Sequence, residues 1–120
     1  MELFIEKYFS YFIILQVIHS QEEIWTNFQK EWPVWKMSRK TFVLCEIMLT
    51  IFLLLVFYWK NIPFRFVIMI TFNLLMFANS IWHIMWAFVK KGYIPGLISS
   101  PLILIAYLFY YYKLILVYVK

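Results

Sequence analysis

A run of nineteen residues from Thr41 to Trp59 contains a single charged side chain, Glu46. An apolar run of this length is sufficient to cross the hydrocarbon core of a bilayer as a helix. Charged residues make up 14% of the whole chain, whereas about a quarter of the residues of a soluble domain are charged. So few charges cannot cover a surface that faces water. The sequence therefore predicts a multi-pass integral protein of the cell membrane, with the lipid bilayer as its main partner.

Basic residues, prolines and a glycine divide the chain into four apolar segments. We expect membrane spans at about residues 8–28, 41–59, 64–89 and 96–119. The first span is the weakest, because a helix long enough to cross must carry Glu22 and Glu23 into or near the hydrocarbon. The short connections favour antiparallel neighbours. The predicted fold is all-α, with one membrane domain over residues 1–120 built as an up-down antiparallel four-helix transmembrane bundle.

Four expectations concern the ends and the course of these helices. Ser38 is suited to cap the start of the second span. Pro95 and Gly96 are expected to open the fourth span, and Pro101 is expected to kink it from within. The first helix is expected to continue to about Phe28.

The formal charge of +5 comes from eleven basic residues, which lie mainly around the ends of the apolar runs. Such a distribution is typical of anchoring at the membrane surface. We therefore expect no nucleic-acid partner. Six basic residues fall on the side of the first and third loops and five on the other side, which leaves the orientation open. A homo-oligomer is also left open.

Polar residues recur at one depth along the predicted spans. Glu23 precedes Lys30 by seven residues, His83 precedes Lys90 by seven, and Glu46 follows Arg39 by seven. Each lies about 10 Å along its helix from a basic residue, at about 1.5 Å per residue. In an up-down bundle these depths form one layer. Its expected members are His19, Glu22, Glu23, Glu46, Asn79 and His83, with Ser99 and Ser100 at the same level.

Within this layer the spacing favours shared faces. His19 lies three and four residues before Glu22 and Glu23, and Asn79 lies four before His83, so each set faces one way on a helix. Two neighbouring carboxylates in a low-dielectric setting require a proton or a cation. Imidazoles with carboxylates suit zinc, iron or manganese, and metal binding is the leading interpretation. The alternative is a metal-free hydrogen-bonded network in which the histidines pair with the glutamates.

Three short motifs occur in order along the chain: His19-x-x-Glu22-Glu23, Asn79-x-x-x-His83 and Tyr93-x-Pro95-Gly96. Together they resemble the HXXEE family, small integral membrane proteins without an established function. The resemblance implies a divalent metal, zinc or iron, held by His19, Glu22, Glu23 and His83, with Asn79 and Tyr93 nearby. Gly96 and Tyr93 would shape the entrance. Glu46 is not part of these motifs and depends on the depth argument alone.

We expect first a metal-dependent membrane hydrolase that acts on a lipid or another apolar substrate. The metal would be held by both histidines and one of Glu22 or Glu23, and the other glutamate would act as general base. Tyr93 would donate to a developing oxyanion. The second hypothesis is a non-catalytic structural or accessory protein of the immunity type. The third is an ion or proton permease, which ranks last because the far halves of the second and fourth spans offer almost no polar residues.

Overall fold

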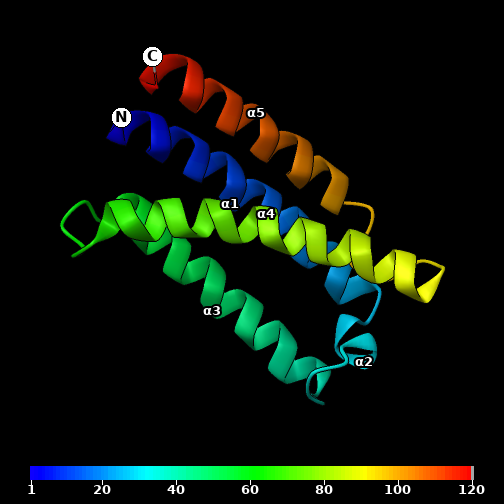
Figure 1. Ribbon diagram of the computed structural model, residues 1–120. Coiled ribbons are helices and arrows are strands. Elements are labelled where there is room, and N and C mark those ends of the chain that lie inside the picture. The colour runs from blue at the N-terminus through cyan, green and yellow to red at the C-terminus, as the bar shows by residue number, and fades with distance from the viewer. Residues whose placement is uncertain (120) are drawn as a thin grey trace.

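A computed structural model describes residues 1–119 of the chain, and these residues form helices and connecting turns with no strand (Figure 1). Five helices follow one another: α1 (Glu2–Trp25), α2 (Phe28–Glu31), α3 (Arg39–Tyr58), α4 (Arg65–Lys90) and α5 (Ser100–Tyr118). The predicted all-α fold is confirmed. The second and third spans match α3 and α4 to within two residues at each end.

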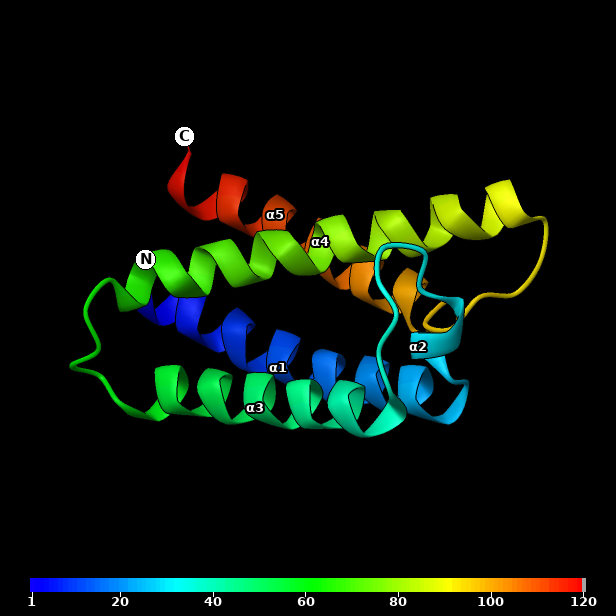
Figure 2. The same ribbon diagram turned by 90° about the horizontal axis from the view of Figure 1, so that it is seen from below.

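The helix α1 is the central element. It contacts α3, α4 and α5, while α4 also packs along α5. Figure 1 shows α1 lying between α5 and α3, with α4 crossing in front of it. The connection from α3 to α4 lies at the end of the molecule where the chain begins. The short helix α2 and the connection from α4 to α5 lie at the opposite end (Figure 2). These two connections therefore border the same end of α1.

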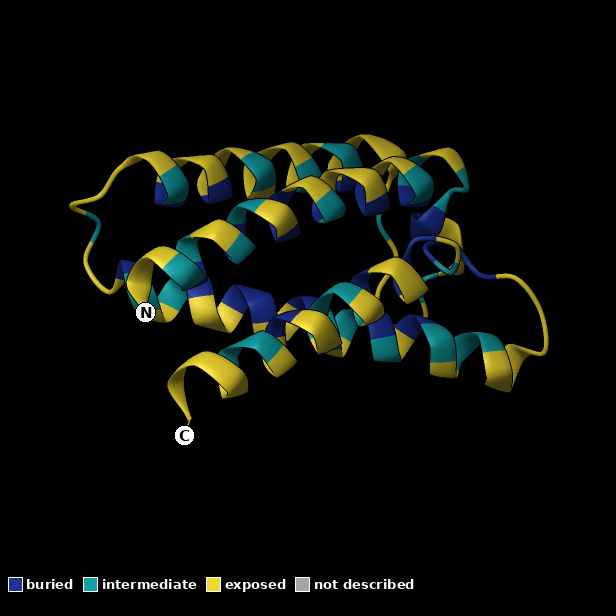
Figure 3. Ribbon diagram, turned by 90° about the horizontal axis from the view of Figure 1, so that it is seen from above, coloured by how far each residue is buried: buried dark blue, intermediate teal, exposed yellow. Residues whose placement is uncertain are grey.

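The apolar residues separate into an inner core and an outer surface. Phe9 and Phe12 of α1, Leu53 of α3, Met69 of α4 and Ile103 of α5 are almost completely buried and belong to one cluster. The outer faces of the long helices are exposed over most of their length (Figure 3), and their exposed residues are largely apolar. Helices α3, α4 and α5 are each long and apolar enough to cross a membrane. This pattern is consistent with a membrane protein.

The first helix differs from the prediction. It begins at Glu2 and ends at Trp25 instead of continuing to Phe28. The Thr26 hydroxyl donates to the Glu22 carbonyl oxygen at 2.6 Å, and Asn27 adopts a left-handed backbone with φ of 59°, which asparagine tolerates better than most residues. The chain turns there into α2. With five charged residues, α1 is also not among the helices that are apolar enough to cross by composition.

The start of α5 also differs. The helix begins at Ser100, so Pro95 and Gly96 lie in the preceding turn and do not open it. Gly96 has a φ of +92°, which a helix cannot accommodate. Pro101 occupies the first turn of α5. The backbone N–H groups of a first turn have no partner within the helix, so the missing N–H of proline costs no hydrogen bond there. The expectation of a kink at Pro101 is therefore wrong. The predicted cap is confirmed, since the Ser38 hydroxyl accepts from the Thr41 amide at 3.2 Å.

At the end away from α2, Arg65 is buried with 5% of its surface exposed. Its guanidinium donates to the carbonyl oxygens of Val56 at 2.6 Å and Phe57 at 2.8 Å, in the last turn of α3. It also pairs with Glu6 of α1 at 3.1 Å, and Glu6 is held as well by Lys60. A cation at a helix C-terminus satisfies its free carbonyls and its dipole. Arg65 therefore connects α1, α3 and α4 rather than anchoring the chain in the headgroups.

Candidate metal centre

Three side chains of the kind that can bind a metal meet inside the end of the molecule nearest α2. His19 and Glu23 lie one helical turn apart on α1, and His83 faces them from α4. All three are at least 95% buried, and one ligand atom from each lies within 4.8 Å of the others. The two Nε2 atoms are 3.2 Å apart. The Glu23 carboxylate lies 3.3 Å from Nε2 of His19 and 3.7 Å from Nε2 of His83.

These spacings can be compared with a known coordination geometry. Two nitrogens that bind one tetrahedral zinc at about 2.0–2.1 Å lie about 3.3 Å from each other. The nitrogens of His19 and His83, at 3.2 Å, match this value closely. Oε1 of Glu23 lies at a similar distance of 3.3 Å from His19, and Oε2 is the oxygen nearest His83, at 3.7 Å. The three residues therefore fit a small divalent metal with little movement.

The Glu22 carboxylate lies outside this cluster. It accepts hydrogen bonds from the Tyr93 hydroxyl at 2.6 Å and from the backbone amides of Ile98 at 3.0 Å and Ser99 at 2.8 Å. The Ser99 hydroxyl lies 2.7 Å from the same carboxylate. A carboxylate that receives four donors acts as an acceptor only, as the ionised form does. Glu22 thus binds the turn before α5, whereas the sequence interpretation counted it among the metal ligands.

Ser99 connects Glu22 to the cluster and determines which nitrogen of His19 carries the proton. Its Oγ lies 2.6 Å from Nδ1 of His19. Because its one proton goes to Glu22, this hydroxyl accepts from Nδ1–H. The other nitrogen, Nε2, then presents a lone pair to the space shared with His83 and Glu23. A histidine metal ligand is typically oriented by such a hydrogen bond to its second nitrogen.

Asn79 and Gly96 complete the walls around the two imidazoles. The Asn79 amide nitrogen lies 3.1 Å from Nε2 of His19, so it donates to the lone pair that a metal would take. Gly96 approaches both rings: a Cβ at this position would lie 2.6 Å from Cε1 of His83 and 2.7 Å from Cε1 of His19. No other residue fits there without displacing the rings.

Glu46 lies beside the cluster and is not part of it. Its Oε2 accepts from the Ser20 hydroxyl and, at 3.2 Å, from the Gln16 amide. The sequence placed Glu46 in the polar layer, and the structure places it there, but its contacts are with α1 side chains other than the cluster. It therefore lines a separate space between α1 and α3.

Tyr93 lies in the connection between α4 and α5 and is 47% exposed. Partial burial raises the pKa of its phenol, and its hydrogen bond to the Glu22 carboxylate raises this pKa further. Tyr93 is therefore a hydrogen-bond donor at neutral pH. It contacts Glu22 rather than the histidines, and so its expected role as an oxyanion donor is not supported by a contact with the cluster.

A groove of about 420 Å³ borders the site on the side of Glu22. Its polar lining consists of Gln21, Glu22, Thr26, Tyr93 and Ser99. Its remaining wall is apolar and includes Ile18, Trp25 and Leu102. The Ser99 hydroxyl separates this groove from the ring of His19. The groove is thus one hydrogen bond away from the cluster.

The spacing of polar residues in the sequence predicted most of the residues that meet in this cluster. His19, Glu23, Asn79 and His83 are in contact, as their spacing predicted. The connecting role of Ser99 and the amides of residues 98 and 99 were not foreseen, although Ser99 was placed at the right depth. Ser20, which donates to Glu46, was also missed. The only signal for it was its place next to His19 in the motif.

Comparison with known proteins places this chain in a family. Residues 10–111 match the family model described as a protein of unknown function with an HXXEE motif. No curated protein and no solved structure matches the chain. The match covers most of the chain, including the centre formed by α1 and α4 and the turn that carries Gly96. The chain therefore belongs to the HXXEE family.

Proposed function

We propose that this protein binds one divalent transition metal, zinc or iron, through His19, Glu23 and His83. The observation that carries the proposal is the convergence of two imidazole nitrogens, 3.2 Å apart, on one carboxylate in a buried site. The relay from Glu22 through Ser99 to His19 supports it, because it leaves the Nε2 lone pair facing the other two ligands. Glu22 is then a positioning residue rather than a ligand.

The same proposal includes the fourth membrane span. We propose that α1 crosses the cell membrane with α3, α4 and α5 as an up-down antiparallel four-helix transmembrane bundle. The polar residues of α1 that lower its hydropathy, such as Gln16, His19 and Glu23, are buried against its neighbours. Polar groups in a span are tolerated when they face the interior of a bundle. The exposed apolar faces of the other helices would contact lipid.

Metal-assisted hydrolysis of an apolar substrate is the activity that this arrangement supports best. A metal with two histidine ligands and one carboxylate retains an open position at which it can activate water. The groove beside Glu22 and Tyr93 would hold the substrate, since its apolar wall suits an alkyl chain and its polar end lies next to the centre. Ser99 and Glu22 would keep His19 in its binding orientation. Tyr93 would hold Glu22 in place.

Metal analysis of the purified protein tests the central step. Protein purified in detergent and dialysed against metal-free buffer should retain about one zinc or iron per chain. Glu23→Gln, which keeps the size of the side chain, and His83→Ala should each lower the metal content to background. Glu31→Gln is the control, because Glu31 is an exposed residue that pairs with Lys90 outside the centre. Circular dichroism would show that each variant remains folded. A wild-type protein that takes up no metal after incubation with zinc or iron(II) would refute the proposal.

A second candidate is a non-catalytic accessory protein in which the polar cluster stabilises the helix register. The 3.2 Å separation of the Nε2 atoms is also a hydrogen-bonding distance if His83 donates to His19. In that case Glu23→Gln would lower the melting temperature and leave cellular function unchanged. A permease is less favoured, because the core beyond the cluster is formed by apolar residues such as Phe9, Phe12 and Leu53.

A further inference from the structure

Glu46 differs from the other five glutamates of the chain in the partners of its carboxylate. Glu6 and Glu31 pair with lysine, Glu2 lies near Arg65, Glu23 faces the histidines, and Glu22 receives four donors. Within residues 1–119, Glu46 has no basic side chain at ion-pair distance. Its two neutral donors, Ser20 and Gln16, both donate to Oε2. Its Oε1 accepts no hydrogen bond from the described part of the chain.

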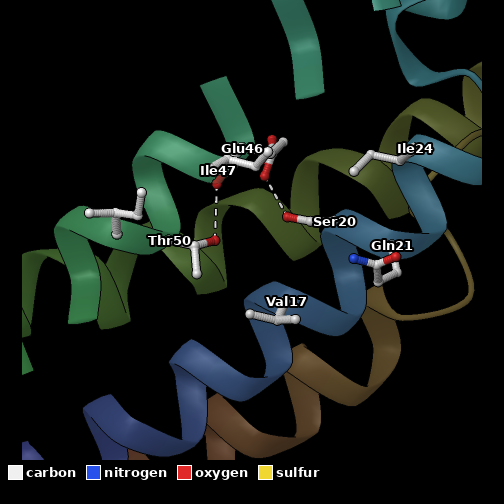
Figure 4. A pocket seen from close by; sticks show the side chains of 8 residues that line it. Val17, Ser20, Gln21, Ile24, Glu46, Ile47 and Thr50 are labelled. Atoms are coloured by element: carbon white, nitrogen blue, oxygen red, sulfur yellow. Dashed lines mark hydrogen bonds between the residues drawn. The ribbon is translucent and has the colours of Figure 1, made fainter. Parts of the chain in front are cut away.

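This carboxylate lines a pocket between α1 and α3 with a volume of about 240 Å³ (Figure 4). Most of the pocket wall is aliphatic, and its aliphatic members are Val17, Ile24, Ile47 and Ile51. The polar members besides Glu46 are Ser20, Gln21 and Thr50. The Thr50 hydroxyl donates to the Glu46 backbone carbonyl at 2.9 Å, so its proton is already used. The pocket therefore combines aliphatic walls with one carboxylate that lacks a cation.

The pocket also opens toward the surface that would face lipid. Ile47 and Ile51 of α3 are 51% and 53% exposed, and Val17 of α1 is 37% exposed. Glu46 lies seven residues from Arg39 at the start of α3, or about 10 Å along the helix axis. An amphiphile in one bilayer leaflet would reach this depth if its head group lay just inside the bilayer surface. The volume is below the range of about 300–1,000 Å³ for pockets that enclose a drug-sized ligand, which suits a small head group and the first part of one chain.

We propose that this pocket, here named the Glu46 pocket, binds an amphiphile that carries a primary amine on a single alkyl chain. The charge of an ammonium group complements the unpaired carboxylate, and one of its three N–H groups can donate to the free Oε1. If Glu46 carries a proton before binding, the proton moves from the carboxyl oxygen to the amine nitrogen, and the same ion pair results. The alkyl chain lies against Val17, Ile47 and Ile51. An anionic head group would meet the carboxylate unfavourably.

The Glu46 pocket is separate from the groove beside Glu22. The two lie on different flanks of α1 and share only Gln21 among the residues that line them. The proposal therefore does not depend on the metal centre. His83→Ala, which should lose the metal, should still bind the amine.

Photo-crosslinking tests this binding directly. The probe is dodecylamine with a diazirine on its chain, added to the full-length protein in nanodiscs of zwitterionic lipid, and mass spectrometry locates the adduct. Labelling is expected on Val17, Ile47 or Ile51, and unlabelled dodecylamine should compete for it. Dodecanol and dodecanoate have the same chain length and should compete poorly. If either competes as well as the amine, the charge argument is wrong.

Two variants and a matched control complete the test. Glu46→Gln should weaken amine binding about 30-fold or more, as expected for the loss of one partner of a desolvated charge pair. Val17→Phe keeps the carboxylate but fills the pocket, and should also reduce labelling. Glu31→Gln removes an equal charge from the surface and should leave binding unchanged. Binding by Glu46→Gln within about twofold of wild type, or labelling that maps elsewhere, would overturn the proposal.

Discussion

Replacing Gly96 by alanine is the most discriminating perturbation of the centre. The added Cβ would lie 2.6 Å and 2.8 Å from Cε1 and Nδ1 of His83, and 2.7 Å from Cε1 of His19. These neighbours are ring atoms that are themselves enclosed, since both histidines are at most 1% exposed. Relieving the contacts to about 3.5 Å, the ordinary separation of carbon atoms, requires shifts of nearly 1 Å. The two rings therefore cannot keep their present positions.

Two costs and one smaller gain determine the change in stability. An alanine at φ of +92° is strained by about 1–3 kcal/mol, and overpacking a filled interior costs about 1–3 kcal/mol. Loss of unfolded-state entropy on replacing glycine offsets about 0.4–1 kcal/mol. The net destabilisation is therefore about 1–6 kcal/mol, which would lower the melting temperature by about 4–24 °C at about 4 °C per kcal/mol.

The assay combines thermal unfolding in detergent with metal content. Gly96→Ala should melt at a lower temperature and should lose bound metal, because ligand atoms must stay within about 0.5 Å of their productive positions. Gly92→Ala is a matched control on the same connection, since a Cβ there would meet nothing within 4 Å. It should change neither readout. A Gly96→Ala protein with the melting temperature and metal content of wild type would refute the close packing of Gly96 on the histidines.

Three further predictions concern residues around the two ends of the molecule. Ser99→Ala removes the hydroxyl between Glu22 and His19 and should weaken metal affinity about 10–100-fold, as measured by competition with a chelator. A change below about twofold would contradict the role of Ser99 in orienting His19. Tyr93→Phe should lower the free energy of unfolding by about 0.5–1.5 kcal/mol at neutral pH. Because the pKa of Tyr93 lies above its usual 10.0, this contribution is complete below pH 10 and is lost as the pH rises through the raised pKa. The melting curves of the two proteins should therefore converge at high pH. Arg65→Met should lower the free energy of unfolding by about 3 kcal/mol, since it removes a buried ion-pair partner. Lys60→Met removes a side chain that is 60% exposed and should cost less than about 1 kcal/mol. Equal effects of the two substitutions would contradict the buried role of Arg65.

Much of the fold was predictable because a bilayer imposes simple length rules. The apolar runs that became α3 and α4 end at charged or proline-containing segments, and their bounds follow from that contrast alone. The depth of Glu23 and His83 was predictable for a related reason. In antiparallel helices of uniform rise, counting residues from the same side places side chains at the same level.

The rotation of each helix and the path of the last connection were not predictable in this way. Glu22 and Glu23 are about 100° apart around α1, and depth alone cannot decide which of them joins the histidines. The answer comes from the turn before α5, which folds back so that Ser99 and the neighbouring amide of Ile98 bind Glu22. The motif Tyr93-x-Pro95-Gly96 marks this turn. The sequence alone does not show that Gly96 of this turn packs against the two imidazole rings.

The weak hydropathy of α1 has a structural explanation that bears on the proposed bundle. Eight residues of α1 and seven of α4 are buried, against three each in α3 and α5, because α1 and α4 each contact all three other long helices. A central helix meets mainly protein, so it can carry Gln16, His19, Ser20 and Glu23 inward without exposing them to lipid. A peripheral helix meets lipid over most of its surface and must be apolar. The low mean hydropathy of α1 therefore comes from residues that contribute to the polar centre and face the other helices. For this reason we propose that α1 crosses the membrane despite its composition.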